Sequence, residues 1–85
     1  MPRYFFHSAD HQRDRDTTGV ELADHAAARI EAVRFAGCVL TDEPRVLEEG
    51  DQFRIEVTDE AQHLLFTVVT LTINAPVVGA PVANS

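Results

Sequence analysis

Apolar and polar residues alternate most clearly in the second half of the chain. Residues 53–58 follow the two-residue period of a half-buried strand, and the alternation resumes at residues 64–73 after a polar break at 59–62. Both sides of the later segment are largely apolar, one with Leu64, Phe66 and Val68 and the other with Leu65, Thr67, Val69, Leu71 and Ile73. The two segments predict a β-hairpin.

The first quarter of the chain predicts two shorter strands. Residues 4–6 are aromatic and have high strand propensity. Residues 20–22 alternate briefly after Gly19 and predict a second strand that pairs with the first. Residues 10–18, which lie between these segments, are polar and predict a solvated loop.

A helical period runs from Asp24, a residue type suited to the N-cap, to about Leu40. One face carries His25, Ala28, Ala32, Phe35, Ala36 and Val39 at spacings of three and four. A second apolar stripe lies roughly opposite and consists of Ala26, Ile30, Val33, Gly37 and Leu40. A helix with two apolar stripes is seldom fully solvated, so we expect its outer side to be covered. The helix should end before Pro44, because the residue before a proline avoids the α region.

The element order β-β-α-β-β predicts an α+β domain in which one helix packs across a small antiparallel sheet. We expect a single domain over residues 1–73, followed by a flexible C-terminal tail at residues 74–85. One face of the last strand should meet the helix and leave the other face or the edge partly uncovered. A symmetric homodimer would cover such a surface. The candidate interface residues are Ile30, Val33, Leu40, Leu65, Val69 and Leu71.

Composition narrows the classes of partner. The 85 residues carry a net charge of −7, all seven basic residues are arginines, and they form no basic cluster. Direct nucleic-acid binding and binding to anionic membranes are therefore disfavoured. The longest apolar stretch, residues 64–73, is too short to span a bilayer as a helix. The single cysteine, Cys38, excludes an intramolecular disulfide, and no apolar leader is visible, so we expect a cytoplasmic location.

Several residues are candidates for a metal site or a reactive group. His7 and His11 could share a metal ion, but no tight three- or four-ligand spacing accompanies them. Asp14, Asp16, Thr18 and Gly19 match part of a calcium loop, but His25 stands where that loop needs a glutamate, so a solvated hairpin loop is the expectation. Cys38 near the helix end is expected to be half-buried and inert. We therefore assign no catalytic, metal or cofactor-binding residue and expect no cofactor.

A family resemblance rests on several short motifs taken in order. They are Pro2-Arg3-Tyr4-Phe5-Phe6-His7, Gly19-Val20-Glu21-Leu22, Ala27-Ala28-Arg29 with Glu31-Ala32-Val33-Arg34, and Glu56-Val57-Thr58-Asp59-Glu60 with Leu65-Phe66-Thr67. Over about residues 2–70 the chain resembles a family of short bacterial proteins known only as a domain of unknown function, which opens with a Tyr-Phe-Phe-His strand. The resemblance implies no activity. It also implies an apolar residue where His25 stands and a glycine where Gln62 stands.

Three functions follow as hypotheses. The leading one is a small intracellular protein-interaction or regulatory module that acts as a homodimer. A second is an antitoxin-like or nucleic-acid-associated accessory protein, whose acidic surface would bind a basic protein partner. A third, a small metal-dependent enzyme using His7 and His11, has no supporting constellation in the sequence.

Overall fold

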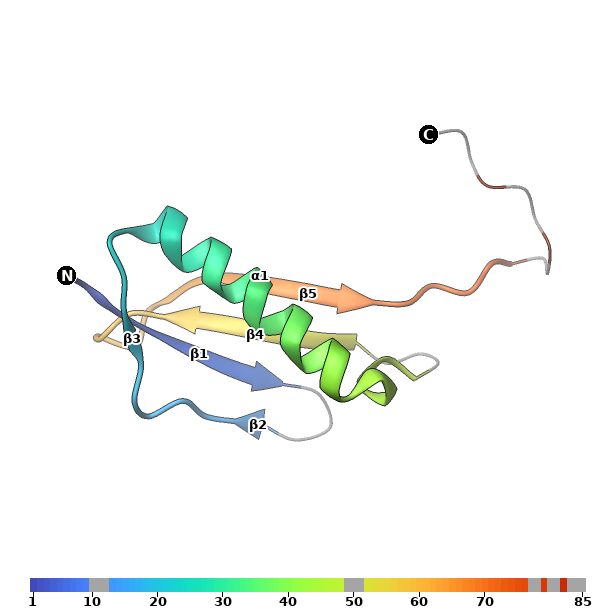
Figure 1. Cartoon of the computed structure of the whole chain (residues 1–85), viewed down its shortest axis with the longest axis horizontal. Coiled ribbons are helices and arrows are strands. Elements are labelled where there is room, and N and C mark those ends of the chain that lie inside the picture. The colour runs from blue at the N-terminus through green and yellow to red at the C-terminus, as the bar shows by residue number, and fades with distance from the viewer. Residues whose placement is uncertain (10–12, 49–51, 77–78, 80–81, 83–85) are drawn as a thin grey trace.

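The computed structural model describes residues 1–9, 13–48, 52–76, 79 and 82. Its strands are β1 (Arg3–Ala9), β2 (Arg13–Asp14), β3 (Val20–Glu21), β4 (Gln52–Thr58) and β5 (Leu64–Leu71). A helix, α1 (His25–Asp42), and a 3-10 helix, η1 (Pro44–Leu47), stand between β3 and β4. The sheet is antiparallel with the order β2-β1-β4-β5, β3 also pairs with β1, and α1 crosses one face (Figure 1). The expected α+β fold is confirmed.

The edge of the sheet beyond β1 is an interrupted strand. β2 pairs with the end of β1, and β3 pairs with its beginning. The expected loop at residues 10–18 is therefore wrong at residues 13–14, which form a short strand, while residues 10–12 lie outside the described residues. Gly19 lies beside β1 with a φ of 75°, and a Cβ there would come within 3.0 Å of the Tyr4 carbonyl oxygen. Both facts favour glycine at this turn.

The core lies between α1 and the sheet. Three alanines of the helix, Ala28, Ala32 and Ala36, are buried against aromatic and branched side chains of the strands. Small side chains let the helix axis lie close to the sheet, and the volume is filled from the strands and from η1. The buried residues opposite the alanines are Tyr4, Phe6, Val46, Phe53, Ile55 and Val57.

The predicted limits of the helix agree with its caps. The Asp24 side chain accepts a hydrogen bond from the Ala27 N–H at 2.9 Å, as expected of an N-cap. The Glu43 N–H donates to the Val39 carbonyl at 2.8 Å, and Pro44 follows. The inner-face prediction is wrong for His25, which is exposed at the helix start and touches Tyr4 ring edge to ring face, with centroids 5.7 Å apart.

The β4–β5 hairpin is confirmed, with one irregularity at its turn end. Val57 pairs with Phe66 but Thr58 pairs with Leu64, so Leu65 is the extra residue of a bulge. In the turn, Gln62 has a φ of 66°, in the left-handed region that glycine adopts without strain. The glycine that the resemblance implies at this position would adopt this conformation without strain.

Candidate functional site

The sheet has one covered face and one open face. The register places Phe6, Ile55 and Val68 together under α1, so their neighbours along each strand point the other way. The open face carries Arg3, Phe5 and His7 from β1, Arg54, Glu56 and Thr58 from β4, and Thr67, Val69 and Leu71 from β5. Within the described residues no second layer covers this face.

The hydrogen-bond pattern shows which backbone groups of β5 point outward. The Phe6 N–H bonds to Asp16 and the Pro2 carbonyl bonds to the Leu22 N–H, so the even-numbered residues of β1 turn their backbone away from β4. Backbone direction alternates along each strand, so the odd-numbered residues of β1 bond to β4, and the odd-numbered residues of β4 bond to β5.

The same alternation carries over to the last strand. Phe66, Val68 and Thr70 lie opposite odd-numbered residues of β4 and bond inward to that strand. Thr67, Val69 and Leu71 then direct their N–H and C=O groups to the outer side of β5. In the described part of the chain no strand pairs there, so β5 is a free sheet edge.

Exposed apolar side chains accompany this free edge. Leu64, Val69 and Leu71 are 60%, 47% and 49% exposed, and Ile73 follows at 84%. All four lie in the part of the sequence, residues 64–85, that has no charged side chain. We call Leu64, Val69, Leu71 and the outward backbone of β5 the β5 surface.

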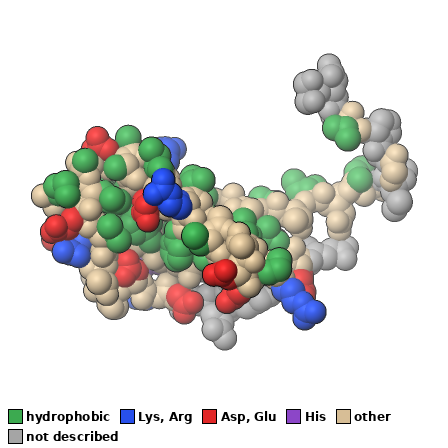
Figure 2. All heavy atoms as spheres, viewed as in Figure 1, with side chains coloured by type: hydrophobic (Ala, Val, Ile, Leu, Met, Phe, Trp, Pro, Cys, Tyr) green, Lys and Arg blue, Asp and Glu red, His purple; other side chains and the backbone are tan. Residues whose placement is uncertain are grey.

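The six candidate interface residues are distributed over three environments. Ile30 and Val33 are exposed on the outer side of α1, at 61% and 57%. Leu40 and Leu65 are half-buried and pack against the core. Val69 and Leu71 belong to the β5 surface. Figure 2, viewed from the side of α1, shows hydrophobic side chains between scattered charges over this face.

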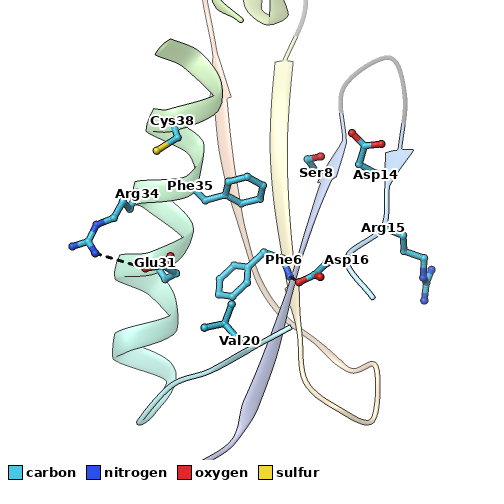
Figure 3. A pocket seen from close by; sticks show the side chains of 10 residues that line it. All are labelled: Phe6, Ser8, Asp14, Arg15, Asp16, Val20, Glu31, Arg34, Phe35 and Cys38. Carbon is cyan, nitrogen blue, oxygen red and sulfur yellow. Dashed lines mark hydrogen bonds and ion pairs between the residues drawn. The ribbon is translucent and has the colours of Figure 1, made fainter. Parts of the chain in front are cut away.

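A groove of about 530 Å³ lies between α1 and the interrupted edge. Phe6 and Phe35 point into the space between the helix and β1, while Arg15 points away from it (Figure 3). Glu31 and Arg34 form an exposed ion pair at 3.7 Å on the helix side. Cys38 also lines the groove and is exposed, so the expected half-burial of this thiol is wrong. Cys38 follows the buried Ala36 by two residues, which turns its side chain away from the buried face of α1 and leaves the thiol open.

Asp16 organises the interrupted edge. Its carboxylate accepts hydrogen bonds from the N–H groups of Phe6, Thr18 and Gly19 at 3.2, 2.9 and 3.1 Å. Burial raises the pKa of this carboxyl, but the N–H groups of Gly19, Thr18 and Phe6, and then the His7 ring, outweigh that effect, so the pKa lies below the ordinary 3.8. The carboxylate therefore replaces a missing strand carbonyl and has a structural role.

His7 is held by hydrogen bonds at both ring nitrogens. Its Nδ1 accepts from the Asp16 N–H at 3.0 Å, and its Nε2 lies 3.0 Å from the Thr58 hydroxyl. The ring also stacks on Phe5, with centroids 6.5 Å apart and planes at 4°. These contacts position His7 as a link between β1, β4 and the loop that carries Asp16.

The structure places the remaining histidines apart from His7. His25 lies at the start of α1, and His63 lies beside Asp59 at 3.4 Å in the β4–β5 turn. His11 is outside the described residues. Within the described ranges no three His, Cys, Asp or Glu side chains gather closely enough to hold a metal ion, and no helix is long and apolar enough to cross a membrane.

Sequence reasoning missed the groove and the role of Asp16. The spacing Asp16-Thr17-Thr18-Gly19 is a signal for the latter, because an aspartate before a glycine often accepts hydrogen bonds from the backbone of its own turn. The groove has no such signal, since it is lined by residues far apart in sequence, from Phe6 to Cys38.

The fold and its surfaces define a small α+β domain with a free sheet edge. Residues 3–72 match the model of a protein family, the domain of unknown function DUF6894. The chain belongs to this family, as the Tyr4-Phe5-Phe6 opening and the later motifs indicated. No curated protein and no solved structure matches the chain.

Proposed function

We propose that this chain is a small intracellular protein-interaction module that acts as a homodimer. The observation that carries the proposal is the β5 surface, where Leu64, Val69 and Leu71 are about half exposed or more beside an unpaired strand edge. Exposed apolar side chains that gather on one surface are typical of interfaces. Long free edges are also normally covered, charged or broken, because they recruit other strands.

The distribution of charge supports the same reading. The chain carries a net charge of −7, so two copies repel each other over most of their surface. Residues 64–85 have no charged side chain, so two copies can meet there without bringing like charges together. The single, free Cys38 supports a reducing compartment, since small secreted domains usually rely on disulfides.

Sedimentation equilibrium over a range of micromolar concentrations tests the homodimer. We expect the mass to rise with concentration towards twice that of the 9.4 kDa chain. A single-chain mass at every concentration would contradict it. Val69→Glu, which adds a charge to the β5 surface, should keep the chain monomeric over the same concentrations. Val33→Glu adds the same charge to the exposed outer side of α1 and should leave the association unchanged, which makes it the matched control.

Binding of a basic protein partner is the second candidate, and the net charge of −7 favours it. Native mass spectrometry of protein recovered from its own cells distinguishes the homodimer from a complex with a basic partner. A complex with a second, basic polypeptide whose affinity falls steeply with salt supports this candidate, and recovery as the bare dimer contradicts it.

A further inference from the structure

We infer that two copies join by antiparallel pairing of β5 with β5, which makes one continuous sheet across the dimer. This inference rests on the proposed homodimer and specifies its interface. The outward N–H and C=O groups of Thr67, Val69 and Leu71 are the groups that would pair. Strand addition at a free edge is an established mode of protein association, in which backbone hydrogen bonds provide the contact.

A second copy is the occupant that fits this edge. Two identical strands that pair antiparallel are related by a two-fold axis, so each outward donor meets an acceptor of the same edge and the assembly closes at two copies. The other edge of the sheet does not offer this geometry. It is interrupted between β2 and β3, where the Asp16 carboxylate occupies the Phe6 N–H.

The distribution of charged residues among the strands also favours pairing at β5. β1 and β4 carry Arg3, Arg54 and Glu56, whereas all eight residues of β5 are uncharged. Edge strands that stay single usually carry a charge or a proline as protection against pairing. β5 has neither a charge nor a proline. Of its three residues with outward backbone groups, Val69 and Leu71 are apolar.

The register follows from the outward residues. A two-fold axis at Val69 places Val69 opposite Val69 of the second copy, and Thr67 opposite Leu71 of the second copy. This register uses all six outward groups of Thr67, Val69 and Leu71 in each copy. It also brings the exposed side chains of Val69 and Leu71 together on the open face of the joined sheet.

Val69→Pro tests the backbone pairing. Proline removes the outward N–H of residue 69, and an edge strand tolerates proline where its N–H faces solvent. The matched control is Val68→Pro, which removes an inward N–H bonded to β4 and is expected to lower the thermal midpoint of the monomer. We expect Val69→Pro to keep the circular-dichroism spectrum of the folded chain and to raise the dimer dissociation constant at least about tenfold.

Val69→Lys is the second variant and covers the case in which proline disturbs the fold. Lysine keeps the backbone donor but places two like charges opposite each other, so it should also weaken the dimer. A dimer that both variants leave unchanged overturns β5 pairing while the homodimer stands. A wild-type chain that is monomeric throughout overturns the homodimer itself.

Cysteine cross-linking tests the register in a Cys38→Ser background, which removes the exposed native thiol. Residues opposite each other in hydrogen-bonded antiparallel pairs have Cα atoms about 5.5 Å apart, within the range of a disulfide. Val69→Cys should therefore form a linked dimer on oxidation. Thr67→Cys should not, because four residues of offset separate the two copies of position 67 by about 14 Å. Linking at 67 and not at 69, or at neither position, overturns the inferred register.

Discussion

Asp16 shows how one side chain completes an interrupted strand. Three backbone N–H groups donate to its carboxylate, and its own N–H donates to His7 Nδ1. The residue thus joins the loop at 15–19 to β1. Without the carboxylate, the Phe6 N–H would face the gap between β2 and β3 with no partner from the loop.

Asp16→Ala should lower the free energy of unfolding by about 1–2 kcal/mol, because it removes three backbone-to-carboxylate hydrogen bonds at a partly buried site. Urea denaturation monitored by circular dichroism measures the change. Asp14→Ala, at an exposed aspartate in the same segment, is the control and should change stability by less than about 0.5 kcal/mol. Equal effects of the two substitutions would contradict the structural role of Asp16.

The pKa of Asp16 also predicts a pH dependence. Burial acts to raise this pKa, but the backbone N–H groups and His7 lower it below 3.8 in the folded protein. A carboxyl with a lowered folded-state pKa stabilises the fold fully above its unfolded-state pKa. That contribution is lost as the pH falls through about 4 towards the folded-state pKa.

We expect the free energy of unfolding to fall as the pH drops from about 5 to about 2, and to fall less steeply in Asp16→Ala. Urea denaturation at a series of pH values measures both slopes. Asp59 keeps a slope of the same sign in the variant, because the backbone N–H of His63 lowers its pKa as well. Identical slopes in the two proteins would contradict the assignment to Asp16.

At the scale of elements, the close packing of α1 depends on its alanines. Ala28 and Ala32 are fully buried against the sheet, and Ile55 and Val57 lie fully buried in the same core. Ala32→Leu should therefore destabilise the protein by about 1–3 kcal/mol through overpacking, measured as a shift in the urea midpoint. Val33→Leu, on the exposed side of the same helix, should leave the midpoint nearly unchanged. If the two substitutions cost the same, the helix does not pack as described.

In the β4–β5 turn, a substitution is expected to stabilise the protein. Gln62 has a φ of 66°, and left-handed backbone costs a non-glycine residue about 1–2 kcal/mol. Gln62→Gly should raise the thermal midpoint, because relief of this strain exceeds the added entropy of the unfolded chain. Ala61→Gly, one residue earlier and without positive φ, should lower the midpoint or leave it unchanged. A lower midpoint for Gln62→Gly would contradict the turn geometry.

The sequence predicts the long elements, which have a hydrophobic period, better than the short ones. Long periodic segments predicted α1, β4 and β5, and the Asp24 and Pro44 signals placed the helix ends within about two residues. β2 has two residues and η1 has four, too few to show a period, and both depend on neighbours distant in sequence. The polarity of residues 13–14 therefore indicated a loop, although their backbone pairs with β1.

The candidate surface was predictable only in part. The apolar residues on both sides of segment 64–73 predicted an uncovered surface that includes Val69 and Leu71, and both are exposed on the open face. The same pattern could not separate them from Leu65, which fills a bulge beside the core. Side-chain period does not reveal which backbone groups of a strand stay unpaired, because this depends on strand order.

At the scale of the whole molecule, β5 is the meeting point of two acidic domains in the proposed dimer. One edge of the sheet is interrupted by the Asp16 loop, and the other edge is continuous and uncharged. Pairing at β5 would give each small domain a longer sheet and a share of its neighbour's apolar surface. Such sharing stabilises a chain of 85 residues, which has only a small core of its own.

Residue-resolved amide hydrogen exchange tests this account most directly, measured by NMR at concentrations above and below the dimer dissociation constant. The N–H groups of Phe66, Val68 and Thr70 bond to β4 and should be protected at both concentrations, which provides an internal control. Those of Thr67, Val69 and Leu71 should exchange rapidly in the dilute protein and slowly in the concentrated one. Rapid exchange at these three positions at every concentration would contradict β5 pairing.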